Sequence, residues 1–237
     1  MSFIPKRVML DSKEIQNDEY KDQGIYYWIN EVNCIKGKIL IWGLIGSLYE
    51  DMPMIYSAEF PPEYPFEPPK ILFLTSDGYT RFHPNMYKEG KVCLSILGTW
   101  EGPKWAATLR LSTAALSIQS LMDNNPIVHE PGYETRNDIY TKSYNEFIGY
   151  QCLKYVVSMI ESYAKGSIPI LLSEFEDEFI ERLPKIRERV QCKLDKISED
   201  KSWIQIPYSM TGKTDYTTMK QRFASACQKI DIKTFRV

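Results

Sequence analysis

The chain has 237 residues, of which 25% are charged and 43% are hydrophobic, and its formal net charge at pH 7 is -2. These values are typical of a globular protein with a sizeable core, and they exclude an intrinsically disordered chain. Because there is no surplus of basic residues, we expect no nucleic-acid partner.

Neither a membrane segment nor a secretory signal is expected. The longest apolar run, residues 39–48, falls well short of the roughly 20 residues that cross a bilayer, and the first residues lack the apolar stretch of a signal peptide. We therefore expect the protein in the cytosol or nucleus, with no membrane partner. The five cysteines form no C-x-x-C pair, so we expect reduced thiols and no metal site.

The first part of the chain predicts a helix followed by a sheet. A short amphipathic helix is expected at about residues 5–16, and four extended segments between residues 25 and 75 predict an antiparallel meander. Between the third and fourth segments stands FPPEYPFEPPK, residues 60–70, with five prolines. Proline fixes the backbone and removes a hydrogen-bond donor, so this stretch predicts a rigid exposed loop.

The period becomes helical beyond residue 110. Helices are expected at 111–122, 142–163, 172–194 and 215–229, with a short joint at 163–170. The first of these helices is expected to end at DNNP, where Asn125 precedes Pro126, because a residue that precedes proline rarely adopts the helical conformation. The predicted class is α+β, with only helices after the sheet.

One irregular segment lies between the sheet and the helices. It reads RFHPNMYKEGKVCLSILGTW, residues 81–100, and it contains His83, Asn85 and Cys93. FPPEYPFEPPK, then FHPN, then a cysteine eight positions after Asn85 in GKVCLSIL, then a Trp and a helix that ends in NNP resemble the ubiquitin-conjugating enzyme family. The resemblance covers about residues 5–163 and implies the UBC fold, with a conjugating core at 1–165 and a C-terminal helical extension at 166–237.

A narrower resemblance is also visible. GKVCLSILGTWEGPKW, SIQSLMDNNPIVHEPGYE, SYNEFI and the C-terminal DYTTMKQRFASACQKI are similar to the large conjugating enzymes that the alternative, non-classical ubiquitin-activating enzyme charges. That subclass includes members that also accept a ubiquitin-like protein. The resemblance therefore leaves the modifier open.

The resemblance implies that Cys93 accepts ubiquitin or a ubiquitin-like protein as a thioester and passes it to a substrate lysine, with or via a ligase. A thiolate is both a good nucleophile and a tolerable leaving group, which suits a carrier. No metal or cofactor of its own is expected, because the activating enzyme consumes the ATP. Two alternatives stay open: a non-catalytic ubiquitin-binding variant, and a cysteine hydrolase that pairs Cys93 with His83 or His129.

Three further residues have implied roles near the cysteine. The family's asparagine, here Asn85, supports the cysteine loop or stabilises the oxyanion, and both roles stay open. His83 is expected to form hydrogen bonds within its turn. Many members place an acidic residue after NP to activate the lysine, whereas this chain has Val128 there; His129, beside it, is either a base near neutral pH or a solvated loop residue.

Partner surfaces are implied in the same way. The first helix, with Lys6, Arg7 and Lys13, matches the family face that meets the activating enzyme, and positive charge steers an acidic partner. Phe66, next to Pro65 in the rigid loop, matches the apolar residue that RING-type ligases contact. The family's second ligase loop reads Ser-Pro-Ala after its Trp, and this chain departs from it with WAA at 105–107, which leaves the ligase type open. The extension has three readings: it covers the core, braces the cysteine loop, or selects the activating enzyme.

Overall fold

The structure, a computed structural model, describes residues 6–234. The chain forms two compact units, residues 1–136 and 137–237. This division concerns compactness alone, and the functional boundary that we expect after residue 165 stays a prediction.

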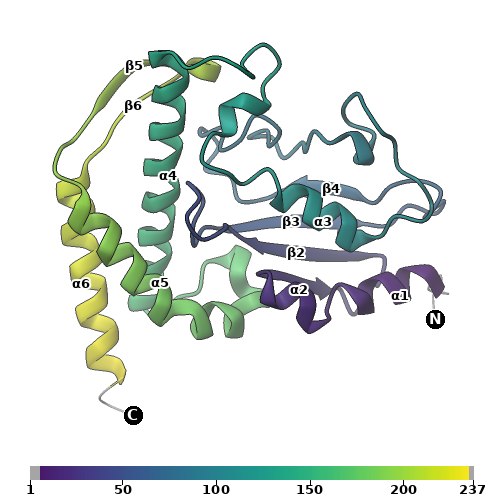
Figure 1. Cartoon of the computed structure of the whole chain (residues 1–237). Coiled ribbons are helices and arrows are strands. Elements are labelled where there is room, and N and C mark those ends of the chain that lie inside the picture. Colours follow the sequence, from purple (N-terminus) through teal and green to yellow (C-terminus); the bar gives the residue numbers. More distant parts are fainter. Residues whose placement is uncertain (1–5, 235–237) are drawn as a thin grey trace. The chain divides into compact units, whose positions relative to one another are not determined.

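The first unit is an antiparallel sheet with helices (Figure 1). Its strands follow one another in the order β1-β2-β3-β4, which confirms the predicted meander. Helix α3 contacts strand β2, and α1 packs against α3. The elements are α1 (Lys6–Glu14), α2 (Asp18–Asp22), β1 (Ile25–Ile29), β2 (Lys36–Trp42), β3 (Pro53–Glu59), β4 (Lys70–Phe73) and α3 (Leu111–Gln119). The predicted first helix began at residue 5, which lies outside the described residues, and the one-turn helix α2 was not predicted.

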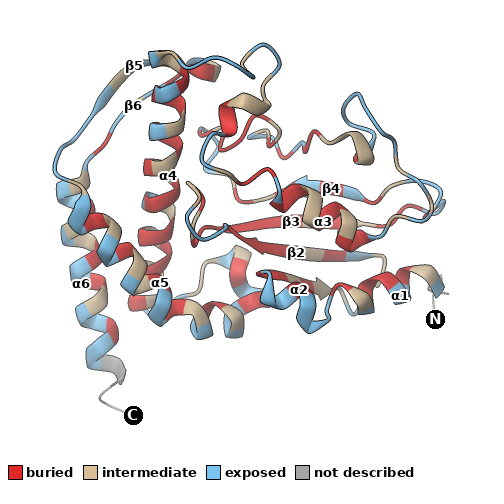
Figure 2. Ribbon diagram, in the orientation of Figure 1, coloured by how far each residue is buried: buried red, intermediate tan, exposed pale blue. Residues whose placement is uncertain are grey.

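The middle strands are the most buried part of the sheet. Consecutive residues of β2 and β3 are buried, as Figure 2 shows, and Leu40 of β2 lies opposite Ile55 of β3. Apolar β-branched and aromatic side chains suit such a position because they pack on a pleated surface. The turn into β2 is fixed by Asn30, whose side-chain oxygen accepts the N–H groups of Val32 and Asn33 at 3.0 and 2.9 Å. The loops that follow β4 are therefore built on a well-packed platform.

The second unit consists of three long helices and a hairpin. Helix α4 begins where Asp138 accepts the backbone N–H of Thr141 at 2.9 Å, earlier than predicted. Helix α5 continues through Pro184. The elements are α4 (Ile139–Ala164), α5 (Glu176–Lys196), β5 (Ser202–Ile206), β6 (Met210–Lys213) and α6 (Tyr216–Thr234), with a 3-10 segment at Ile170–Phe175 before α5.

The hairpin of β5 and β6 corrects the prediction that only helices follow the sheet. Its turn uses Tyr208 and Ser209 with φ angles of 65° and 56°, a left-handed conformation that sequences usually mark with Gly or Asn. Gly212 in β6 lies so close to Phe147 that an added Cβ would be 2.5 Å from its ring. The ring of Trp203 meets the same ring edge-to-face, with 5.9 Å between centroids. Packing on α4 therefore determines this hairpin, which has no turn motif in the sequence.

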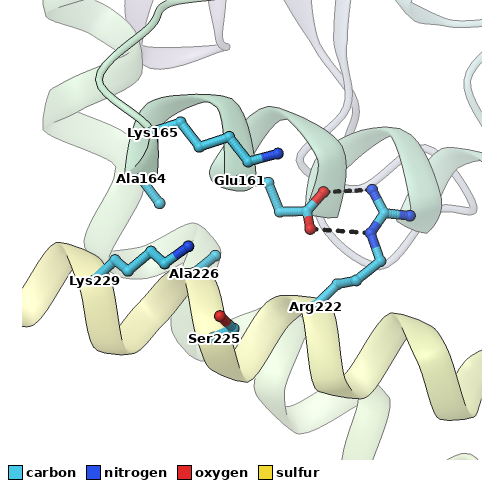
Figure 3. A pocket seen from close by; sticks show the side chains of 7 residues that line it. All are labelled: Glu161, Ala164, Lys165, Arg222, Ser225, Ala226 and Lys229. Atoms are coloured by element: carbon cyan, nitrogen blue, oxygen red, sulfur yellow. Dashed lines mark hydrogen bonds and ion pairs between the residues drawn. The ribbon is translucent and has the colours of Figure 1, made fainter.

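A charged contact joins α4 and α6. Arg222 donates to both carboxylate oxygens of Glu161, with 3.0 Å between Nε and Oε1 (Figure 3). Hydrogen bonding to Arg222 lowers the pKa of Glu161. The pair borders a small hollow, lined by Glu161, Ala164, Lys165, Arg222, Ser225, Ala226 and Lys229. A two-point bond from a planar guanidinium adds geometric specificity to the contact between these helices.

Within residues 6–234, no helix combines the length and the apolar character needed to cross a membrane. The described part of the chain also contains no group of three His, Cys, Asp or Glu side chains that could hold a metal ion.

Candidate active site

Cys93 closes a short hairpin-like turn that follows β4. The backbone N–H of Tyr87 donates to the carbonyl of Lys91 at 2.9 Å, and the N–H of Cys93 donates to the carbonyl of Asn85 at 2.8 Å. Along an antiparallel pair of strands, the numbers of two opposite residues always add up to the same total. The pairs Tyr87–Lys91 and Asn85–Cys93 give the same total, so they belong to one register. The separation of eight between Asn85 and Cys93 is therefore the register of the turn.

Two contacts anchor this turn to the sheet. The N–H of Phe73 in β4 donates to the carbonyl of Gly90 at 2.8 Å. The buried hydroxyl of Tyr56 in β3 contacts the sulfur of Met86 at 3.2 Å. Because both partners belong to the central sheet, the turn is held at a fixed place relative to the core.

The side chain of Asn85 reinforces the same pairing. Its Nδ2 donates to the carbonyl oxygen of Cys93 at 2.7 Å, and the second N–H of that amide has no hydrogen-bond partner among the described residues. The first of these N–H groups supports the cysteine segment, and the oxyanion role of Asn85 stays a prediction. Only 1% of the surface of Cys93 is exposed, so a reaction partner reaches Sγ only after neighbouring atoms move.

His83 is fully buried beside this pair. Its Nδ1 accepts the backbone N–H of Asn85 at 3.0 Å, which requires an unprotonated Nδ1. Burial holds the pKa of His83 well below its ordinary value of 6.5, and the nearby His129 lowers it further. The structure thus places a neutral imidazole in the turn, and its part in a reaction stays a prediction.

His129 lies against His83, with 5.1 Å between ring centroids. Its Nε2 is 2.9 Å from Oδ2 of Asp123, an ion pair when His129 is protonated. Among the described residues, neither histidine is hydrogen-bonded to Cys93. A cysteine hydrolase needs a thiol and an imidazole in contact, so the site lacks the pair on which that alternative depends.

Sequence reasoning missed two residues of this neighbourhood. Thr99 forms hydrogen bonds on both sides of Cys93, and Asp123 pairs with His129. A lone threonine in a loop and an acidic residue next to Asn124 carry no sequence signal for these contacts. The fold alone brings them to the site.

Comparisons with known proteins cover the segment that contains this turn. The family model described as ubiquitin-conjugating enzyme matches residues 7–151, which include the whole turn and Cys93. The chain belongs to the ubiquitin-conjugating enzyme family. Its α+β architecture is the UBC fold that the sequence predicts.

Several conjugating enzymes are similar to the chain. Ubiquitin-conjugating enzyme E2 Z of Homo sapiens is 35% identical over 211 residues, covering 87% of this chain and 58% of that protein. The protein of the same name from Danio rerio is 42% identical over 146 residues, covering 60% and 44%. A solved structure, the E2 domain of a Toxoplasma gondii ubiquitin conjugating enzyme, has 25% identity and a TM-score of 0.45, covering 60% of this chain and 94% of that one. The chain spans about 58% of the length of the human relative.

The helix predicted to meet the activating enzyme is α1. Lys6 and Lys13 are exposed on it. Arg7 differs from them, because its guanidinium donates to the buried Asp11 at 2.8 Å and to the carbonyl of Leu109 at 2.6 Å. The charge of Arg7 is therefore used within the first unit, and the exposed charges of this helix face belong to the two lysines.

The proline loop predicted to meet a ligase is held from two sides. Trp105 Nε1 donates to the carbonyl of Pro65 at 2.8 Å, and the hydroxyl of Tyr64 donates to Asp11 in α1. Phe66 projects from this loop with 82% of its surface exposed. An exposed aromatic ring on a fixed loop loses little conformational entropy when it is buried by a partner.

Proposed function

We propose that the protein is a ubiquitin-conjugating enzyme that carries ubiquitin, or a ubiquitin-like protein, as a thioester on Cys93. The observation that supports it is the pairing of Cys93 with Asn85 in the turn that the family model covers. A transferase of this kind needs one nucleophilic thiolate and one donor for the developing oxyanion. Cys93 and the unpaired N–H of Asn85 have this chemistry.

The proposed reaction has two acyl transfers. In the first, the thiolate of Cys93 attacks the carbonyl of the modifier's C-terminal thioester on the activating enzyme; a new C–S bond forms, and the activating enzyme's thiolate leaves. In the second, a lysine amine attacks the thioester carbonyl; the C–N bond forms, the C–S bond to Cys93 breaks, and the nitrogen loses a proton. Transfer to a ligase cysteine follows the first pattern. ATP is consumed upstream, so we propose no cofactor in this chain.

His129 is the candidate that would influence the incoming lysine. It lies in the loop after Pro126, and its pairing with Asp123 gives it a fixed orientation. A histidine oriented by a carboxylate can accept the proton that an attacking amine loses. His83 has the supporting role of holding the turn through the N–H of Asn85.

The proposed partners meet the first unit. The activating enzyme would contact the α1 face where Lys6 and Lys13 flank the exposed Met9 and Leu10. A ligase, of RING type in our proposal, would contact Phe66. Because the sequence motifs resemble the subclass charged by the alternative activating enzyme, we propose the alternative activating enzyme as the donor. We propose the cytosol or nucleus as the location.

A charging assay tests the proposal. The protein is incubated with ATP, ubiquitin and either the classical or the alternative activating enzyme, and adducts are resolved on gels with and without reductant. We expect a reductant-sensitive adduct with the alternative enzyme, its loss in Cys93→Ala, and a reductant-resistant ester in Cys93→Ser. Cys192→Ser, which removes an exposed thiol on α5, is the matched control and should leave the adduct unchanged.

The outcomes separate the candidates. A thioester that forms only with the classical enzyme would refute the subclass assignment and leave the carrier role intact. An adduct that persists in Cys93→Ala would place the carrier thiol elsewhere. No adduct of ubiquitin or of a ubiquitin-like protein with either enzyme would refute the carrier role and favour the non-catalytic variant of the fold.

A further inference from the structure

Both peptide groups that flank the Cα of Cys93 are fully hydrogen-bonded. Asn85 binds the N–H and the C=O of Cys93 itself, at 2.8 and 2.7 Å. Thr99 binds the two remaining groups: its Oγ1 donates to the carbonyl of Val92 at 2.6 Å and accepts the N–H of Leu94 at 2.9 Å. The backbone on either side of the cysteine is therefore held at four points by two residues.

The position of Thr99 results from the loop that connects it to Leu94. A 3-10 turn, Ser95–Leu97, is followed by Gly98 with a φ of 70°, a left-handed conformation that glycine adopts without strain. The reversal returns the chain so that the N–H of Thr99 also donates to the carbonyl of Leu94 at 3.3 Å. The hydroxyl then occupies the place that a neighbouring strand would have beside Cys93.

We propose that Thr99 is a positioning residue for acyl transfer: with Asn85 it fixes the peptide planes around Cys93 and so the direction of the Cα–Cβ bond that carries Sγ. This inference rests on the proposed carrier function of Cys93. Fixing a reacting atom in this way matters because a displacement of about 1 Å can reduce a rate by about a hundredfold. Thr99 acts through the backbone and has no contact with the reacting atoms.

A second consequence concerns the oxyanion. The N–H groups of Cys93 and Leu94 already have acceptors, so neither backbone N–H next to the thiol is free to stabilise charge in this conformation. The side-chain amide of Asn85, whose Nδ2 lies 2.7 Å from the carbonyl oxygen of Cys93, is then the donor that we propose for the oxyanion. Thr99 accepts the backbone N–H of Leu94, and the side-chain amide of Asn85 is left for the oxyanion.

Two substitutions at one position test the proposal. Thr99→Val keeps the shape and removes the hydroxyl, and Thr99→Ser keeps the hydroxyl. The matched control is Ser47→Ala, since Ser47 also donates to a carbonyl, that of Leu44 at 2.7 Å, and accepts an N–H, that of Tyr49 at 3.1 Å, in the loop between β2 and β3. Any general cost of losing a bridging loop hydroxyl therefore appears in the control as well.

The first readout is transfer. The thioester is formed, isolated and discharged to free lysine over a concentration series. We expect Thr99→Val to lower the maximal rate on the order of tenfold with an unchanged half-saturating lysine concentration, while Thr99→Ser and Ser47→Ala stay within about twofold of wild type. Equal rates for Thr99→Val and wild type, or an equal loss in Thr99→Ser, would overturn the proposal.

The second readout does not depend on transfer. Alkylation of Cys93 by iodoacetamide is followed by mass spectrometry of its peptide, and we expect Thr99→Val to react several-fold faster because the segment over a buried thiol is loosened. If wild type forms no thioester, the carrier function fails, and the alkylation rates still test whether Thr99 holds the backbone around Cys93. If Thr99→Val does not fold, hydrogen exchange of the backbone N–H groups in wild type tests the proposal instead. We expect the N–H of Leu94 to exchange more slowly than that of the exposed Trp100, and equal rates would contradict the proposal.

Discussion

Lowering the pH from 7.5 to 5 should destabilise the protein through His83. This side chain is fully buried, and burial together with His129 holds its pKa well below 6.5. In the unfolded chain an imidazole titrates near 6.5, so below that pH the unfolded state binds one more proton than the folded state. Stability from this group is complete above about pH 7.5 and is lost as the pH falls from 6.5 towards the folded pKa. The slope approaches about 1.4 kcal/mol per pH unit, which amounts to about 2 kcal/mol by pH 5.

The assay is urea unfolding at pH 5, 6, 6.5 and 7.5, with wild type and His83→Asn. Carboxylates titrate mainly below pH 5 in the unfolded chain, so this window isolates the histidines, and there are only two in the sequence. We expect wild type to lose about 2 kcal/mol between pH 7.5 and 5, and His83→Asn to lose much less. The control, His129→Gln, leaves His83 buried and should keep most of the slope. A flat wild-type profile, or an undiminished slope in His83→Asn, would refute the reasoning.

Three other predictions concern the site and its supports. Asn85→Ala should lower single-turnover transfer from Cys93 to lysine by about 10²–10³-fold, as loss of one oxyanion donor does; a loss under tenfold would exclude that role. Gly212→Ala should destabilise the second unit by about 1–3 kcal/mol in thermal unfolding, because its Cβ would overlap the ring of Phe147; an unchanged midpoint would contradict the packing. Phe66→Ala should change stability by less than about 0.5 kcal/mol, since its ring is exposed, and lower the ratio of ligase-stimulated to unstimulated discharge several-fold; an unchanged ratio would remove Phe66 from the ligase surface.

The central sheet and the cysteine turn could be predicted from the sequence because their signals are local. Alternating apolar segments separated by turn residues mark β1 to β4. The eight-residue spacing from Asn85 to Cys93 is a hairpin register, and any insertion within it would break the pairing of Tyr87 with Lys91. The spacing of these two residues in the sequence therefore predicts which backbone groups are paired in the turn.

Other parts of the site arise only from the fold. The hairpin of β5 and β6 was missed because its turn uses Tyr208 and Ser209 in left-handed conformations without a glycine. Asp123 and His83 both meet His129, yet nothing in their separation along the chain requires it. Such contacts depend on how the loop after α3 packs against the cysteine turn, and local sequence patterns do not predict this tertiary packing.

The burial of Cys93 has a practical consequence for labelling. Cys192 on α5 is exposed, whereas Cys93 shows 1% of its surface. A maleimide dye added in slight excess at low temperature should therefore tag Cys192 and the partly exposed Cys34 and Cys227 before the proposed carrier thiol. A fluorescent form of the protein prepared in this way would allow its encounters with activating enzyme and ligase to be followed in real time without a fused reporter domain.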